Sequence, residues 1–174
     1  MALDAPRGGR NAVNTHDFIA RYAGVYEHSP WVAERVAPLA SELDDVAQLA
    51  ALLADCVDNA SPEQQLALIR AHPDLAGRAE VAGTLTRDST IEQASAGLDQ
   101  CTEDEFALFQ TLNAAYWEKF GFPFVMAVRG CARAEILESF KTRLENSYNV
   151  EFETALTEIH KIARLRLESM GIAG

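Results

Sequence analysis

A helical pattern over residues 102–121 is the feature that most constrains the fold. Thr102 and Glu105 have the spacing of a capping box, in which the two side chains satisfy N–H groups at the start of a helix. Bulky side chains then recur every three or four residues, and Gly121 is a typical residue to end the helix. A long helix with one apolar face needs other elements to cover that face. The expected inward positions are Phe106, Phe109, Leu112, Asn113, Tyr116 and Phe120.

Helical periodicity also dominates the rest of the chain. Ser61 and Gln64 form a second capping-box pattern around Pro62. No pair of alternating strands with a hairpin turn is visible, so we predict an all-α, single-domain bundle of roughly seven to nine helices over residues 14–174. A flexible leader is expected over residues 1–13. The other helical apolar stripes run over residues 18–26 (closed by Ser29-Pro30), 46–57, 136–144 and 152–170. A short segment is expected over 31–36 and an extended segment over 121–128. Residues 74–88 are mixed in character and could hold a short helix.

The charge balance argues against several classes of partner. The 174 residues include 15 Lys and Arg against 26 Asp and Glu, a net charge of -11, which disfavours nucleic acid and anionic membranes. No apolar run approaches the roughly 20 residues of a membrane span, and the N-terminus lacks the apolar core of a secretory signal. Cys56, Cys101 and Cys131 are odd in number and far apart, as is typical of reduced thiols. We expect a cytoplasmic protein.

His72 is the most informative candidate for chemistry. An apolar helical run stops at this histidine, and Pro73 disfavours the helical conformation for it. Two interpretations stay open. His72 can be a structural residue at a helix C-terminus, where the dipole favours it, or a proton-transfer group exposed by the break.

Signatures of metals and common cofactors are absent from the sequence. A di-iron bundle site requires Glu-x-x-His, but none of the four histidines has a carboxylate three residues earlier. The chain contains no HExxH, GxGxxG, GxxxxGK[ST] or GxSxG pattern. We therefore predict no metal site and no cofactor.

Three further features have both a structural and a functional interpretation. Ser89 and Glu92 have capping-box spacing, but Glu92 could also orient or charge His72 in a pocket. Arg166 lies in an apolar stretch and could clamp a carboxylate, although surface placement explains it equally well. The 121–128 segment could present backbone groups to a small polar ligand, or it could be a buried linker.

Several separated motifs together resemble one known family. They are His-Pro-Asp-Leu at 72–75, Ser-x-x-Glu-Gln-x-x-Ala-Gly-Leu at 89–98, and Leu-Asn-x-x-Tyr-x-x-Lys-Phe-Gly-Phe-Pro-Phe at 112–124, supported by Ser-Pro-Trp at 29–31 and Ile-Ala-Arg-Leu-Arg-Leu at 162–167. In order and spacing they are similar to the OHCU (2-oxo-4-hydroxy-4-carboxy-5-ureidoimidazoline) decarboxylases of urate degradation. The resemblance covers about residues 15–170.

The resemblance implies an all-α fold, a homodimer and cofactor-free conversion of OHCU to (S)-allantoin and CO2. It implies that His72 is the catalytic proton donor, with Glu92 as its catalytic partner. Arg166 would lie near the site and engage the leaving carboxylate. The absence of a peroxisomal C-terminal tripeptide suggests a bacterial member. The remaining implied substrate-binding residues are Pro73, Ser89, Gln93, Phe124, Val125, Met126, Ala127 and Val128.

Two other classes of function remain open from the residues alone. A binding module would hold a purine-derived ligand in the same pocket without converting it. A structural or regulatory bundle would show an exposed apolar helix face and no polar pocket around His72.

Overall fold

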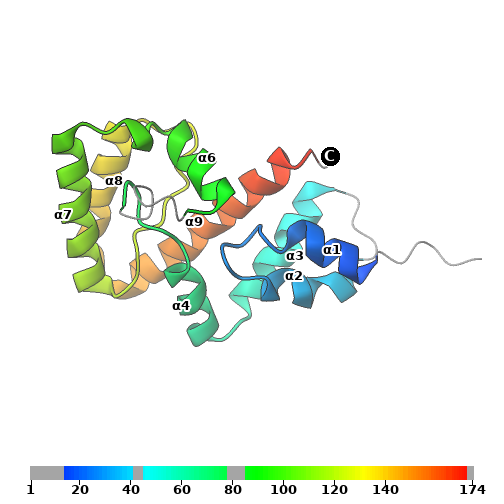
Figure 1. The fold of residues 1–174 in the computed structure, drawn as a ribbon. Coiled ribbons are helices and arrows are strands. Elements are labelled where there is room, and N and C mark those ends of the chain that lie inside the picture. Colours follow the sequence, from blue (N-terminus) through cyan, green and yellow to red (C-terminus); the bar gives the residue numbers. More distant parts are fainter. Residues whose placement is uncertain (1–13, 41–44, 78–84, 172–174) are drawn as a thin grey trace, which may run out of the picture.

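The computed structural model describes residues 14–40, 45–77 and 85–171, and the predicted leader over 1–13 lies outside these ranges. Within them the chain forms eight α-helices, two short 3₁₀ helices and no strand, which confirms the all-α prediction (Figure 1). The helices are α1 (Thr15–Tyr22), α2 (Trp31–Val36), η1 (Ala37–Leu39), α3 (Val46–Asp58), α4 (Pro62–Arg70), α6 (Arg87–Ser95), η2 (Leu98–Gln100), α7 (Glu103–Phe120), α8 (Arg133–Leu144) and α9 (Tyr148–Ser169).

The long helix α9 connects the two ends of the molecule. It packs against α3, α4 and α7, while α7 packs on α8 and α2 packs on α1 and α3. Figure 1 shows α7 and α8 at one end of α9 and the α1–α3 group at the other. The site described below lies along this helix. No helix in the described ranges is long and apolar enough to cross a membrane.

An aromatic cluster joins α7, α8 and the segment that follows α7. The Tyr116 ring contacts Phe120, Phe122, Phe124 and Phe140, with ring centroids 4.5–5.9 Å apart. Phe124 and Phe140 stack at 3.9 Å with an interplanar angle of 9°. All five side chains are buried, and burying a large apolar side chain contributes about 1.5–3 kcal/mol. This packing holds the extended 121–128 segment, which the sequence predicted to be non-helical, against the helices.

Both capping boxes around long helices are confirmed. Ser61 and Gln64 bond each other's backbone at the start of α4, and Thr102 and Glu105 do so at the start of α7. Gly121 ends α7 with φ of 73°, a left-handed conformation that glycine adopts without steric cost.

Two predicted details are wrong. The first apolar stripe predicts a helix that extends as far as residue 26, but α1 ends at Tyr22. Gly24 disfavours continuation of the helix. The carbonyl oxygens of Gly24 and Val25 instead accept hydrogen bonds from the Arg166 side chain. Ser89 and Glu92 do not form a capping box either, because Thr86 is the N-cap of α6 and both residues lie inside the helix. Part of the predicted mixed segment, residues 78–84, lies outside the described residues.

Candidate active site

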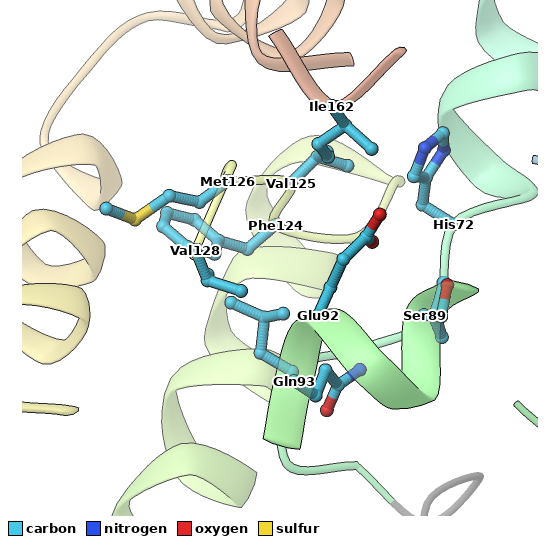
Figure 2. Close-up of a pocket in the computed structure, with 11 residues that line it drawn as sticks. His72, Ser89, Glu92, Gln93, Phe124, Val125, Met126, Val128 and Ile162 are labelled. Carbon is cyan, nitrogen blue, oxygen red and sulfur yellow. The ribbon is translucent and has the colours of Figure 1, made fainter. Parts of the chain in front are cut away.

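A small cavity lies where the end of α4, helix α6, the 121–128 segment and α9 meet (Figure 2). Its empty volume, open solvent at the entrance included, is about 330 Å³. Of the predicted site residues, only Ala127 and Arg166 do not line it. The lining residues are His72, Pro73, Leu75, Ser89, Glu92, Gln93, Phe124, Val125, Met126, Val128 and Ile162.

His72 directly follows Ala71, the C-cap residue of α4. Its Nδ1 is 3.1 Å from the carbonyl oxygen of Leu68, which can only accept, so Nδ1 carries the hydrogen in the neutral ring. Burial lowers the pKa of His72 from 6.5 to about 4, although the hydrogen bond to Leu68 and the charge of Glu27 act to raise it. Near pH 7 the ring is therefore neutral, with Nε2 able to accept a hydrogen bond or a proton.

Helix α6 supplies three polar side chains to the cavity. Ser89, Glu92 and Gln93 lie three and four residues apart, a spacing that puts them on one face of a helix. Figure 2 shows His72 and the Glu92 carboxylate facing the same cavity, and no hydrogen bond joins the two side chains. The structure therefore places the two predicted catalytic residues at the same cavity.

Gln93 lines the cavity, but its amide is already engaged by the protein. Its Oε1 accepts from the Ala76 N–H at 3.1 Å, and its Nε2 donates to the Asp74 carbonyl at 3.2 Å. Ala76 has φ of 48°, which is unusual for a residue with a side chain and needs support from its surroundings. Gln93 supplies such support to the turn after His72.

Arg166 of α9 holds Glu92 from outside the cavity. Its Nε donates to Glu92 Oε1 at 2.8 Å, and its Nη2 donates to Glu92 Oε2 at 3.1 Å and to Glu27 Oε2 at 2.7 Å. Burial disfavours the charge of Arg166, but the hydrogen bonds and charges of Glu92 and Glu27 outweigh burial and raise its pKa. The predicted contact of Arg166 with a substrate carboxylate stays a prediction, since both carboxylates here belong to the protein.

Glu27 is a buried site residue that no motif in the sequence predicts. It is 2% exposed, and its carboxylate accepts from the Thr86 hydroxyl at 2.7 Å and the Ser89 hydroxyl at 3.1 Å. Burial acts to raise the pKa of Glu27, but the Thr86 hydrogen bond and Arg166 together lower it. The only sequence signal is an acidic residue directly after an apolar stripe, which is too common to indicate a site.

A second buried ion pair fixes the wall formed by the 121–128 segment. Arg143 Nη1 donates to the Val125 carbonyl at 2.6 Å, and its guanidinium lies 4.3 Å from the centre of the Phe124 ring. Arg143 Nε in turn donates to Glu151 Oε2 at 2.9 Å. Tyr116 also donates to that oxygen, at 2.5 Å. Side chains of α7, α8 and α9 therefore set the backbone of this wall.

No group of three or more His, Cys, Asp or Glu side chains that could hold a metal ion occurs in the described part of the chain. The polar groups that face the cavity are instead an imidazole, a hydroxyl and an arginine-paired carboxylate. Such a set can accept hydrogen bonds and move protons at a small polar ligand.

Comparison with known proteins identifies similar chains in several organisms. A 2-oxo-4-hydroxy-4-carboxy-5-ureidoimidazoline decarboxylase from Haloferax volcanii is 44% identical over 157 residues, which are 90% of this chain and 90% of that protein. The Mus musculus protein of the same name is 36% identical over 163 residues, 92% of this chain and 89% of that one.

Two solved structures share the fold. The crystal structure of (S)-allantoin synthase matches with a TM-score of 0.72 and 32% identity, covering 89% of this chain and 50% of that one. The crystal structure of OHCU decarboxylase in the presence of (S)-allantoin matches with a TM-score of 0.69 and 25% identity, covering 85% and 95%. The sequence profile of the family described as OHCU decarboxylase matches residues 11–168. The chain therefore belongs to the OHCU decarboxylase family, a family of carboxy-lyases.

Proposed function

We propose that the protein decarboxylates OHCU to (S)-allantoin and CO2 in urate degradation, without a cofactor, and that His72 delivers the proton that completes the reaction. The observation that carries the proposal is the buried, neutral His72, which faces the same small cavity as the arginine-paired carboxylate of Glu92. The relatives and solved structures named above support the reaction itself.

The substrate supplies its own electron sink. Loss of CO2 from the ring carbon leaves an electron pair that the adjacent C=N bond takes up, so no pyridoxal or thiamine group is needed. The ureido-bearing carbon must then be protonated on one face, which creates the S centre. The protein has to hold the ring, exclude water and place one proton carrier on the correct side.

His72 suits the role of proton carrier because of its hydrogen-bonding pattern. The Leu68 carbonyl holds the hydrogen on Nδ1, so Nε2 is the nitrogen that exchanges protons with a ligand. A neutral ring must first accept a proton, from solvent or from the substrate hydroxyl, before it can give one to carbon. We propose this order, uptake at Nε2 followed by delivery, as the way in which His72 acts as donor.

The other cavity residues would bind and orient the substrate. Glu92 is held by Arg166, and Ser89 by Glu27, so neither side chain has to be ordered when the ligand enters. The predicted binding roles of Pro73, Gln93 and the 124–128 backbone are retained as part of the proposal. Gln93 would act through the turn it supports, since its amide is already bonded to Asp74 and Ala76.

The test is the optical activity of the product formed from freshly generated OHCU. With the wild-type protein we expect the circular dichroism of (S)-allantoin to develop, whereas the uncatalysed control forms racemic allantoin, which gives no signal. His72→Asn should slow this by about 10²–10⁴-fold, the usual contribution of a positioned acid or base. His16→Asn, at an exposed histidine of α1, is the matched control and should leave the rate unchanged.

The possible results separate the reaction from the residue assignment. Racemic product at the uncatalysed rate with the wild-type protein would overturn the proposed reaction and favour a binding module. Wild-type activity that His72→Asn retains would leave the reaction in place and overturn the role of His72.

Two further expectations follow from the family resemblance. We propose that the chain forms a homodimer and acts in the cytoplasm. Light scattering after size-exclusion chromatography would test the first by giving twice the 19.0 kDa mass of one chain.

A further inference from the structure

A second cavity shares Glu92 with the first and is lined by four arginines. It lies between the end of α1, the first turns of α6, the residue after Val128 and the C-terminal part of α9, and its empty volume of about 880 Å³ includes open solvent. Figure 1 shows α6 beside α9 at this place, where Arg166 and Glu92 join the two helices. The arginines are Arg21, Arg87, Arg129 and Arg166.

Three of these guanidinium groups have donors that no side chain or carbonyl of the described residues uses. Arg87 has no hydrogen bond or ion pair with any residue that the structure describes, and the contact of Arg21 among these residues is with the Tyr22 ring, at 5.4 Å. Arg129 makes one long hydrogen bond, 3.4 Å to the Leu165 carbonyl. A guanidinium has five N–H donors, so each of the three can still bind an oxyanion.

Most other arginines in the described ranges have a partner within the protein. Arg133, Arg143 and Arg164 each form an ion pair with a glutamate, and Arg70 donates to the Gly121 carbonyl at 2.9 Å. The chain has a net charge of -11, so acidic partners are plentiful. Three arginines around one cavity that pair with no carboxylate of the described residues are therefore unusual in this protein.

The local charge balance favours an anion. Two acidic residues, Asp88 and Glu92, line the cavity. Arg166 is compensated by its ion pairs with Glu92 and Glu27, so the excess positive charge comes from the other three arginines against Asp88. The cavity thus has a positive field in an otherwise acidic protein, which attracts and retains negatively charged ligands. Arginine forks match the two oxygens of a carboxylate and also bind phosphate.

We propose that this cavity is a binding site for a small oxyanion, held by Arg87 and Arg129 with Arg21 at its edge. The ligand chemistry is a carboxylate or phosphate group. Two sources can supply it: the carboxylate of the substrate on its way to the catalytic cavity, or a separate anionic metabolite. The ion-paired Glu92 and Arg166 also line this cavity, and Glu92 lines the catalytic cavity as well, so occupancy can change the geometry of the catalytic cavity.

The test measures binding without any reaction. Malonate and inorganic phosphate are titrated separately into the protein while the side-chain Nε–H resonances of its arginines are followed by NMR. We expect saturable shifts of Arg87 and Arg129 with at least one probe. Arg87→Gln combined with Arg129→Gln should weaken that binding about tenfold or more, because two charge-assisted contacts are lost. Arg164→Gln, at a half-exposed arginine of α9 outside the cavity, is the matched control and should bind as the wild type does.

Non-saturable shifts, or equal affinity in the double variant, would overturn the proposal whether or not the protein decarboxylates OHCU. Steady-state kinetics then distinguish the sources. A probe that raises KM with kcat unchanged, together with a raised KM in the double variant, assigns the site to the approaching substrate. A probe that changes kcat assigns it to a separate anion, and saturable binding with unchanged kinetics assigns it to an anion that does not affect turnover.

Discussion

Arg166 and Glu92 form a two-point contact, in which Nε reaches Oε1 at 2.8 Å and Nη2 reaches Oε2 at 3.1 Å. The guanidinium belongs to α9 and the carboxylate to α6, so the pair fixes one helix against the other and sets the direction of Glu92. Lysine cannot reproduce this paired geometry.

We therefore expect Arg166→Lys to lower kcat by about tenfold or more, since bonds to charged groups contribute roughly 1.5–3 kcal/mol. Glu92 would lose its fixed position, while substrate binding through the rest of the cavity would persist. Steady-state kinetics of the coupled assay measure this, with Arg164→Lys as the control on the same helix. An increase in KM at unchanged kcat would instead show that Arg166 contacts the substrate carboxylate.

Glu27→Gln should destabilise the fold by about 3 kcal/mol. The substitution preserves shape but removes one of the two carboxylates that compensate the buried guanidinium of Arg166, which leaves Glu92 as its remaining ion-pair partner. Urea unfolding measures the change. Glu168→Gln removes the partner of the half-exposed Arg164 and should cost less than about 1 kcal/mol. Equal effects at the two positions would contradict a special role for the buried pair.

Acidification should destabilise the protein partly through His72. The pKa of this group falls from 6.5 to about 4 on folding, so the unfolded chain binds the proton more readily between these pH values. Stability therefore decreases as the pH falls from 6.5 to 4, by an amount on the order of 3 kcal/mol for this group. Below pH 4 its contribution changes no further.

Denaturant unfolding of the wild type and His72→Asn across this pH range isolates the effect. The variant should lose less stability than the wild type on acidification, and the remaining loss includes that of Glu27, whose pKa is also lowered in the fold. Parallel pH profiles for the two proteins would show that His72 keeps an ordinary pKa.

Tyr116→Phe tests the ion pair behind the cavity wall. The variant removes the hydroxyl that donates to Glu151 but keeps the ring contacts with Phe120 and Phe124. We expect a loss of about 1–3 kcal/mol in unfolding free energy, because the buried Glu151 oxygen loses a donor. Activity per folded molecule should change little, since Arg143 still holds the Val125 carbonyl. Lost activity at unchanged stability would place Tyr116 in the reaction itself.

Local signals in the sequence predicted the helices well. Capping residues such as Ser61 and Thr102 act within one turn of the chain, and apolar periodicity reports the buried face directly. The end of α1 was misplaced because Val25 and Tyr26 are buried in a turn. Burial gives the same apolar pattern whether the backbone is helical or not.

The candidate site was predictable only in part. The break at His72-Pro73 is a local signal, whereas the motif resemblance was needed to join it to Ser89 and Glu92. Glu27 could not be found, because its importance comes from contacts with Arg166, 139 residues away, and with Ser89. Such contacts leave no periodic trace in a single sequence.

The hydroxyl of Ser89 donates its hydrogen to Glu27 and so offers only lone pairs to the cavity. Nε2 of the neutral His72 and the carboxylate of Glu92 also only accept. A tight inhibitor should therefore present N–H or O–H groups to this end of the cavity. A compound that presents carbonyl oxygens there would place its lone pairs against those of the protein and form no hydrogen bond. It would bind weakly, however well its shape fits.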